Sequence, residues 1–308
     1  LNDNLNSLDG YGFTIKEIST RSDLFSTVKK NLIISNLTLT GEKVYGNNYA
    51  GGLINTINNG SNVTVKNCKI YLHSGSDIPT SIDSDDHLEA LRWIYANTSG
   101  GLVGLNNGHL KIESSFVATN IGLSASDATT GGLVGLNNGT LTIDKAYTDC
   151  YLYGNNVGGL IGNNEGTVDI SNTYTAGFIG TDGSDDAKLV GLVFGEVNEI
   201  KNSYTVIAKG YLDNTRLIID NKGITLDAKE DNSIYYATVK SAVNSKNVYF
   251  LRGDKNTDVG DYYNELTTNL GDDFNLTGIS SYPYKLMGTS LTSYNYHKLI
   301  GMKHYGDW

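Results

Sequence analysis

The 308-residue sequence contains only two Pro, two Cys, two Met and two Trp. Its net charge is −10, and no run of basic residues is longer than Lys29–Lys30. A nucleic-acid-binding surface is basic, so nucleic acid is excluded as the natural partner, and an anionic membrane surface would repel the chain. No apolar stretch reaches the ~20 residues of a membrane-spanning helix, so we expect no membrane insertion within this chain. The acidic balance instead favours solubility.

The abundant residues are Gly, with 36 copies, and Tyr, with 21 copies. A Gly-Leu motif, in most copies Gly-Gly-Leu, recurs five times, and its leucines are spaced by 49, 31, 27 and 32 residues. The repeated residues are Gly52, Leu53, Gly101, Leu102, Gly132, Leu133, Gly159, Leu160, Gly191 and Leu192. A period near 30 residues is typical of a solenoid, in which each unit packs only against its neighbours. The sequence therefore predicts an all-β fold, a parallel β-helix of about six to seven coils.

Between these motifs the apolar residues alternate with polar ones, which predicts strands with one inward face. Stacked coils should align like residues into ladders. One predicted ladder contains Ile34, Val65, Ile112, Ile143, Ile170 and Ile200, and another contains Leu24 and the five repeat leucines. A third column is aromatic, with Phe116, Tyr147, Tyr174 and Tyr204 and an extension to Tyr249. Packing is favoured for this column over the alternative, a platform for carbohydrate.

The glycines of the repeat have a predicted geometric role. The Asn-Asn-Gly segments at 106–108 and 137–139 are expected to adopt positive φ at sharp corners. The Gly-Gly pairs are expected to let neighbouring strands pass closely.

The two cysteines, Cys68 and Cys150, are predicted to be free and buried. Cys68 aligns with Ala146 in the repeat, so Cys150 lies four positions further along and two copies later. A disulfide requires Cα atoms within roughly 7 Å, whereas two coils separate them by about 10 Å.

Two segments interrupt the repeat, and a third follows it. Residues 74–97 lengthen one unit, and Ser84 or Asp85 is positioned to cap a short helix there. This helix would carry the apolar residues Leu88, Leu91, Trp93 and Ile94. Residues 205–246 form the second interruption. We therefore expect a solenoid over residues 1–252 and a C-terminal capping region over residues 253–308.

No catalytic motif is present. The segment from His87 to Leu91 lacks the second His of a zinc-peptidase motif. The strand carboxylates Glu113, Asp144 and Asp169 are expected at different offsets of the repeat, which argues against a glycosidase pair. We expect no catalytic residue, while a glycan-cleaving activity remains an alternative.

The candidate binding residues lie in the interruptions. An insertion often emerges on the binding face of a solenoid, and this one offers His87, Glu89, Arg92 and Trp93 as ligand-binding residues. No cofactor is expected, although two acidic loops are candidates for calcium. Their carboxylates are Asp83, Asp85, Asp86, Asp182, Asp185 and Asp186. Solvated turns also carry such clusters, so both interpretations stay open.

The pattern Gly-Gly-Leu-Val-Gly-x-Asn-x-Gly, followed by Asn-Ser-Tyr, resembles the GLUG repeat of secreted Gram-positive proteins. Repeats of this kind occur ahead of the metallopeptidase domain in IgA-specific peptidases and in large adhesins. The resemblance covers roughly residues 5–250 and implies β-helical coils without catalytic residues of their own. The ending from Tyr282 to Trp308 is similar to that of some pilin-like surface proteins.

The leading hypothesis is a non-catalytic extracellular β-solenoid of a bacterial surface adhesin or pilus-associated protein, located on the cell surface. It would act in host attachment as a rigid stalk that displays a ligand-binding region. Its partners would be a host glycan, a matrix protein or other subunits of a surface assembly. The alternative is an accessory domain of a secreted peptidase, or a polysaccharide-degrading enzyme.

Overall fold

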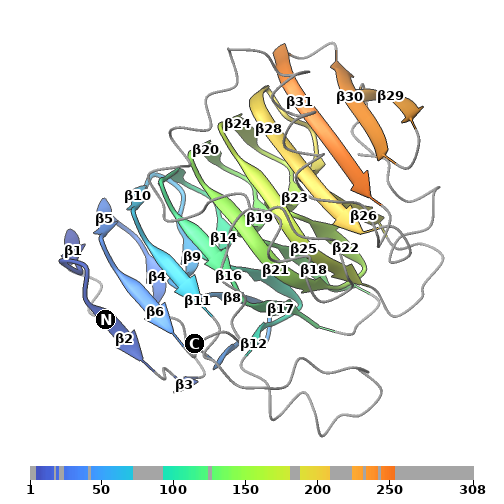
Figure 1. Cartoon of the computed structure of the whole chain (residues 1–308). Helices are drawn as coiled ribbons and strands as arrows, with labels where there is room; N and C mark the ends of the chain where they lie inside the picture. The colour runs from blue at the N-terminus through green and yellow to red at the C-terminus, as the bar shows by residue number, and fades with distance from the viewer. Residues whose placement is uncertain are drawn as a thin grey trace, which may run out of the picture.

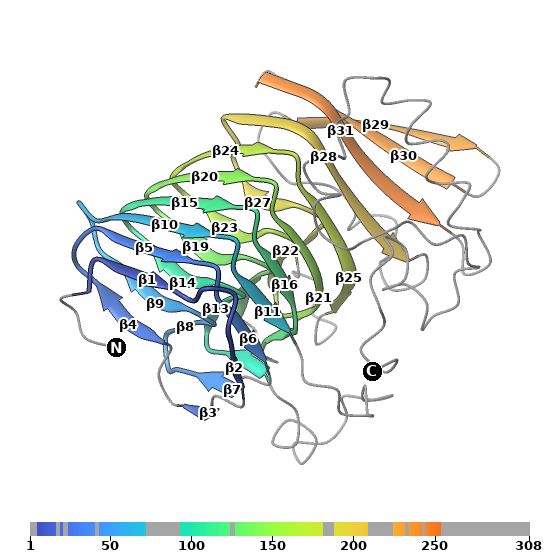
Figure 2. The same cartoon turned by 60° about the vertical axis from the view of Figure 1, so that its left-hand side comes forward.

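The computed structural model describes residues 5–16, 19–20, 24–40, 43–71, 93–123, 127–180, 188–208, 224–231, 234–241 and 244–253. Within these ranges every regular element is a β-strand. Strands from successive windings lie beside one another in parallel and form a β-helix, as predicted (Figures 1 and 2). No helix of the described chain is long and apolar enough to cross a bilayer.

Each winding passes through the same series of strands. A six-stranded parallel sheet contains β4 (Phe25–Val28), β9 (Ile54–Ile57), β14 (Val103–Asn106), β19 (Val134–Asn137), β23 (Ile161–Asn164) and β27 (Val193–Gly195). A five-stranded parallel sheet contains β8 (Tyr49–Gly51), β13 (Thr98–Gly100), β18 (Thr129–Gly131), β22 (Asn156–Gly158) and β26 (Lys188–Val190). Six windings therefore pass through the first of these sheets.

The largest sheet bends around the remaining side of each winding. Its first stack contains β1 (Ser7–Asp9), β5 (Leu32–Ser35), β10 (Asn62–Lys66), β15 (His109–Glu113), β20 (Thr140–Asp144), β24 (Thr167–Ser171) and β28 (Glu199–Ala208). After the bend follow β2 (Thr14–Lys16), β6 (Thr38–Thr40), β11 (Lys69–Tyr71), β16 (Phe116–Ala118), β21 (Tyr147–Tyr153) and β25 (Tyr174–Gly180). A third, shorter stack contains β3 (Ser19–Thr20), β7 (Lys43–Tyr45), β12 (Trp93–Tyr95) and β17 (Asn120–Gly122).

The strands follow one another in register, and this confirms the predicted isoleucine ladder. Ile34, Val65, Ile112, Ile143, Ile170 and Ile200 occupy paired positions on successive strands. All six side chains are buried. Burying one such side chain contributes about 1.5–3 kcal/mol, so the ladder is a main source of stability.

The predicted leucine ladder is confirmed as well. The backbone N–H of Leu53 donates to Leu102, and the same bond recurs from Leu102 to Leu133, from Leu133 to Leu160 and from Leu160 to Leu192. These five side chains are at most 1% exposed, and Leu24 packs against the same core.

The Gly-Gly pairs lie where backbones approach closely, as predicted. A Cβ on Gly132 would lie 2.0 Å from the carbonyl oxygen of Gly159 in the next winding. Gly101 stands in the same relation to Gly132, at 2.1 Å. Real Cβ atoms do not approach a carbonyl oxygen this closely, so only glycine fits.

The prediction of positive φ at the Asn-Asn-Gly corners is wrong. Neither Gly108 nor Gly139 has a positive φ, and both are required because a neighbouring backbone leaves no room for a Cβ. Five of the six described non-glycine residues with positive φ instead form a column at the bend between the first two stacks of the large sheet. They are Asn36, Asn67, Ser114, Lys145 and Asn172. Asn is common in this conformation, and a repeated corner imposes it on Ser and Lys too.

The aromatic column is in register from Phe116 through Tyr147, Tyr174 and Tyr204 to Tyr249. The rings of Phe116 and Tyr147 have centroids 4.6 Å apart, and both side chains are at most 1% exposed. For these two residues the structure confirms packing over a carbohydrate platform.

The predicted helix is wrong at its C-terminal end. Trp93 and Ile94 belong to β12, which pairs in parallel with β7 and β17. Ile94 is fully buried between Val44 and Ile121, so it occupies an inward position of the strand. Ser84, Asp85, Leu88 and Leu91 lie outside the described residues.

The end of the described chain departs from pure parallel stacking. β31 (Asn244–Gly253) pairs in parallel with β28 and continues the large sheet. β29 (Ile224–Asp231) and β30 (Ile234–Ser241) form an antiparallel pair, and β30 adds antiparallel to β31 (Figure 1). The segment 205–246 therefore includes a hairpin on the solenoid sheet. The capping region predicted over residues 253–308 lies outside the described residues, apart from Gly253.

Both cysteines are free and buried, as predicted. Lys69, Phe116 and Tyr147 occupy one register, which places Cys68 in line with Ala146. Removal from water raises the pKa of the Cys68 thiol to about 11.

Candidate functional site: a polar groove along one corner

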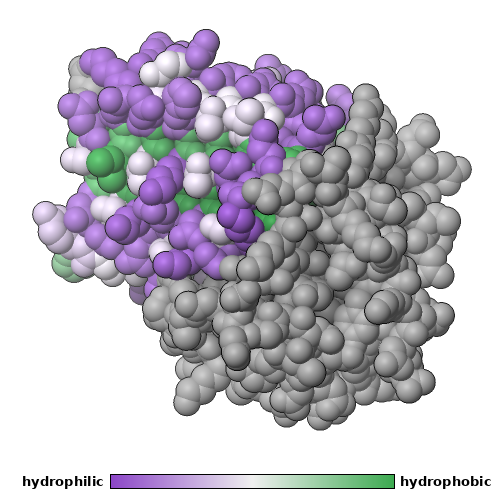
Figure 3. Space-filling view, turned by 90° about the horizontal axis from the view of Figure 1, so that it is seen from above, coloured by the Kyte–Doolittle hydropathy of each residue, from purple (hydrophilic) through white to green (hydrophobic). Residues whose placement is uncertain are grey.

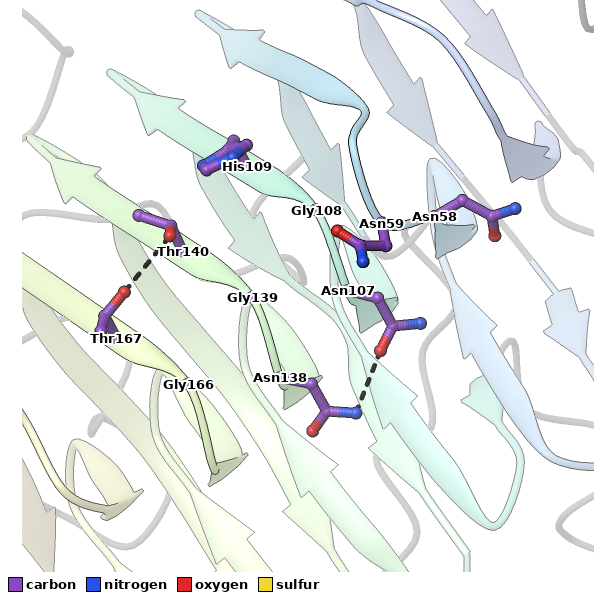
Figure 4. A pocket seen from close by; sticks show the side chains of 10 residues that line it. All are labelled: Asn58, Asn59, Asn107, Gly108, His109, Asn138, Gly139, Thr140, Gly166 and Thr167. Atoms are coloured by element: carbon purple, nitrogen blue, oxygen red, sulfur yellow. Dashed lines mark hydrogen bonds between the residues drawn. The ribbon is translucent and has the colours of Figure 1, made fainter.

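A groove runs over the corner at which the six-stranded sheet leads into the first stack of the large sheet. It encloses about 750 Å³ and crosses several windings (Figure 4). Its lining consists of amide, hydroxyl and imidazole side chains and glycines: Asn58, Asn59, Asn107, Gly108, His109, Asn138, Gly139, Thr140, Gly166 and Thr167. None of these side chains is a carboxylate or an amine.

The groove follows from three consecutive positions of each corner. In two corners the first position projects an amide outward, from Asn107 and from Asn138, and the Asn138 amide donates to the Asn107 carbonyl oxygen at 3.0 Å. In the next corner this position is the exposed Glu165, whose carboxylate accepts a hydrogen bond from the Asn163 amide at 3.1 Å. The third position projects the imidazole of His109 in one corner and a hydroxyl in the next two, where the Oγ1 of Thr167 donates to that of Thr140 at 3.3 Å. Between them lies a glycine without a side chain, so a trough separates two polar rows (Figure 4).

Backbone packing fixes the glycine floor. A Cβ on Gly139 would lie 2.0 Å from the carbonyl oxygen of Gly108, and one on Gly166 would lie 2.1 Å from that of Gly139. A larger residue would both fill the trough and push the windings apart. The floor is therefore a consequence of close coil stacking.

One end of the groove lies at a longer corner. Residues 58–61 contain two residues more than the equivalent Asn107–Gly108 segment, given the pairing of Asn62 with His109. Gly60 adopts a φ of 80° and lies at the exposed tip of this corner. Ser61 ties the corner down, since its hydroxyl donates to the carbonyl oxygen of Val28 at 3.2 Å.

A buried ladder of amides supports the groove from inside. Asn106, Asn137 and Asn164 are at most 5% exposed, and each lies immediately before an outward residue of the corner. The Asn106 amide donates to Asn137 at 2.7 Å, and the Asn137 amide donates to Asn164 at 2.6 Å. Buried polar groups require such partners, so the ladder fixes the corner geometry of successive coils relative to one another.

A similar polar chain lies at the left-handed corner. The Asn67 amide donates to Asn36 at 2.7 Å, and the Asn36 amide donates to Asp9 at 3.1 Å. The Tyr11 backbone N–H and then the Asn36 amide hold the pKa of the Asp9 carboxyl below its usual value. Polar rows in the coil-to-coil direction thus occur at two corners of the solenoid. On the face seen in Figure 3, hydrophilic residues lie on both sides of a narrow hydrophobic band.

Of the predicted ligand-binding and calcium-binding residues, only Trp93 lies among the described residues. Trp93 belongs to β12, whereas His87, Glu89 and Arg92 lie outside the described residues. The six aspartates of the candidate calcium loops, Asp83, Asp85, Asp86, Asp182, Asp185 and Asp186, also lie outside them. In the part of the chain that is described, no group of three or more His, Cys, Asp and Glu could hold a metal ion.

The expectation about the strand carboxylates is wrong for one pair. Glu113 and Asp144 occupy the same register on β15 and β20, and only Asp169 is offset. Each carboxylate has a partner of its own: Glu113 forms an ion pair with Lys111 at 2.7 Å. Asp144 accepts hydrogen bonds from Ser171 and Asn172, both at 2.8 Å. The predicted alignment of Ile112 with Ile143 already implies this register, since Glu113 and Asp144 are the residues that follow them.

The Asn-Asn-Gly motif predicted a corner of the solenoid but not the groove. The groove was missed because its two polar rows come from residues that are each unremarkable in one coil. The available signal was the repetition of an outward amide, a glycine and an outward polar residue at the period of the solenoid.

Comparison with known proteins gives one distant structural likeness. The chain is similar to the crystal structure of a candidate immunoglobulin A1 protease from Bacteroides ovatus, with a TM-score of 0.48 and 12% sequence identity. The likeness covers 92% of this chain and 76% of that chain. No protein-family model and no curated protein matches the sequence. The likeness is too distant to assign a function, and the resemblance to GLUG repeats stays a prediction.

Proposed function

We propose that this chain is a non-catalytic β-solenoid of a bacterial surface adhesin or pilus-associated protein, and that it presents the polar groove to a ligand. The observation that carries the proposal is the composition of the groove, which offers amides, hydroxyls and an imidazole in rows that repeat with the coil. The amides and hydroxyls donate and accept hydrogen bonds without charge. The ligand class that matches them is an extended, neutral, hydroxyl-rich chain, that is, a host or matrix glycan.

The fold supports a display role. In-register apolar ladders make each winding depend on its neighbours, so the solenoid acts as one rigid body that holds the groove open. A site that is already formed spares the entropy cost of ordering protein side chains and loops on binding, and this compensates in part for a shallow surface. On the same proposal the protein is extracellular and attached to the cell surface.

The groove is tested by glycan-array binding of the wild type and of a double variant, Asn107→Ala with Asn138→Ala. Both side chains lie on the outer surface, so the double variant should fold normally, and we expect its glycan affinity to fall about tenfold, equivalent to about 1.4 kcal/mol. Thr142→Ala, at an outward position on β20 that does not line the groove, is the matched control and should bind as the wild type does. Equal binding by all three proteins would contradict a groove site.

The insertion requires a separate variant. β11 ends at Tyr71 and β12 begins at Trp93, so the variant should lack residues 74–91 and keep both strands. Loss of glycan or matrix-protein binding in this variant, with retention in the groove double variant, would transfer recognition to the insertion and its residues His87 and Glu89.

A polysaccharide-degrading activity is the second candidate, and the shared register of Glu113 and Asp144 is the observation that favours it. Two carboxylates on adjacent coils are the minimum for glycoside hydrolysis. Depolymerisation of a glycan by the wild type, abolished by Glu113→Gln and by Asp144→Asn, would establish it. The remaining alternative, an accessory domain of a secreted peptidase, is tested by examining the parent reading frame for a His-Glu-x-x-His segment.

A further inference from the structure

A second hollow lies at another corner of the solenoid, between the end of β7 and the start of β9. It encloses about 500 Å³, within the roughly 300–1,000 Å³ typical of ligand sites. Its lining is Tyr45, Gly46, Asn47, Asn48, Tyr49 and Asn55. Unlike the polar groove, it combines aromatic rings with amides.

The register of the coils fixes one of its rings. Tyr45 of β7 pairs with Tyr95 of β12, although 49 residues separate them in the chain. Their rings are stacked, with centroids 5.5 Å apart and an angle of 10° between the planes. The residue opposite Tyr95 on the next strand, β17, is Gly122, which has no ring. The stack therefore ends at Tyr95 in that direction.

Hydrogen bonds to the next winding and within the corner itself hold the backbone of the hollow. The Gly46 N–H donates to Tyr95 at 3.1 Å, and the carbonyl oxygen of Asn48 accepts from Thr98 at 2.9 Å. Inside the corner the Asn55 amide donates to the carbonyl oxygen of Tyr49 at 2.6 Å. A Cβ on Gly46 would meet that same carbonyl oxygen at 2.3 Å, so the turn requires glycine. The hollow is therefore formed before any ligand arrives.

The lining chemistry is that of a site for a neutral sugar ring. A tyrosine ring offers an apolar face with a polar tip, and the apolar face of a pyranose packs against such a surface. The exposed amides of Asn47 and Asn48 can donate to and accept from ring hydroxyls. Among the described residues that line the hollow no side chain is charged, which disfavours an anionic ligand.

We propose that this hollow binds one pyranose ring of a neutral glycan, as a site separate from the polar groove. The proposal rests on the proposed function in so far as both sites take the same class of ligand. Together they would give one chain two contact points on a glycan surface, and linked sites bind more tightly than either one alone.

The experiment uses the methyl glycosides of glucose, galactose, mannose and N-acetylglucosamine as probes, with binding followed by saturation-transfer NMR. The variant Asn47→Ala with Asn48→Ala changes two exposed side chains, and circular dichroism checks that it folds. We expect it to reduce affinity for the bound glycoside about tenfold, equivalent to about 1.4 kcal/mol. Tyr45→Leu, which removes the aromatic face but keeps an apolar side chain, should reduce the affinity in the same way.

The groove double variant, Asn107→Ala with Asn138→Ala, separates the two proposals. Binding that is lost in the hollow variants and kept in the groove variant supports the hollow. Binding that is lost only in the groove variant overturns the hollow and leaves the proposed function standing. Absence of binding of any of the four glycosides to the wild type overturns the hollow as a site for single rings, whereas array binding of longer glycans would still support the groove.

Discussion

At the scale of single residues, neighbouring asparagines of one corner have opposite environments. Asn137 is fully buried, and its amide donates to Asn164 while its carbonyl oxygen accepts from Asn106. Asn138, the next residue, lies exposed on the groove. The same residue type therefore stabilises the core at one position and is available for ligand contact at the next.

This difference predicts the effects of two alanine substitutions. Asn137→Ala removes the partner of two buried amides, so we expect the free energy of unfolding to fall by about 2–4 kcal/mol. Asn138→Ala changes an exposed side chain and should alter it by no more than about 0.5 kcal/mol. Urea unfolding measures both. Similar values for the two variants would show that the buried ladder does not contribute to stability.

The Cys68 thiol gives a pH-dependent prediction. Burial raises its pKa from 9.0 to about 11 in the folded state, so above pH 9 the unfolded chain loses this proton first. The stabilisation is complete below pH 9 and is lost as the pH rises from about 9 to about 11. From pH 8 to pH 10.5 the free energy of unfolding should fall in both proteins. We expect the fall to be about 1–3 kcal/mol smaller in Cys68→Ala than in the wild type.

Urea unfolding at the two pH values provides the measurement. Tyrosine and lysine titrations are common to both proteins, so they cancel in the comparison. An equal loss of stability in the wild type and the variant would contradict a raised thiol pKa.

At the scale of elements, a strand of the solenoid has one face that determines stability and one that is available for other functions. Ile143 of β20 is fully buried between Ile112 and Ile170, whereas Thr142, its neighbour, faces outward and is half-buried. Ile143→Ala should lower the free energy of unfolding by about 2–5 kcal/mol, because it leaves a cavity in a continuous ladder.

The matched variant Thr142→Ala should lower the free energy of unfolding by less than about 1 kcal/mol. Thermal or urea unfolding followed by circular dichroism distinguishes the two variants. A larger effect for Thr142→Ala would mean that the outward face, and not the ladder, determines the stability of the strand.

At the scale of the whole molecule, the coil is the unit that can be removed. Gly131 and Gly158 occupy the same register on β18 and β22, and Val134 and Ile161 do so on β19 and β23. Deletion of residues 132–158 joins Gly131 to Gly159 and brings Val103 opposite Ile161, so both ladders continue. We expect this variant to keep its β-sheet circular dichroism and a cooperative unfolding transition.

Small-angle scattering should show the shortened solenoid, because one coil contributes about 4.8 Å along the stacking direction. Deletion of residues 132–145, about half a coil, is the control, and it should abolish folding because it places polar positions opposite apolar ones. Folding of the half-coil variant, or failure of the full-coil variant, would contradict a solenoid in which coils are interchangeable.

The repetition of the coil is visible in Figure 2, where the successive strands of each face lie side by side from one winding to the next. The antiparallel pair β29–β30 ends this order, since β30 runs against β31. A coil of the central region therefore has equivalent neighbours on both sides, and a strand of the hairpin does not.

The sequence by itself determined the period, the inward ladders and the free cysteines. Burial of apolar side chains imposes a strict alternation along each strand and a strict repeat between strands, and both are visible as residue patterns. Because Ile112 and Ile143 share a register, the residues that follow them, Glu113 and Asp144, also share one.

Only the tertiary structure decided where the groove and the hollow lie on the surface. The polar groove depends on which residues of a corner point outward, and the hollow depends on a contact between Tyr45 and Tyr95 across a long insertion. The strand at Trp93 and Ile94 was hidden by the same insertion, because a short apolar segment fits a helix or a strand until its neighbours are known. Corners and insertions have no fixed period, so their geometry follows from the packing of whole coils.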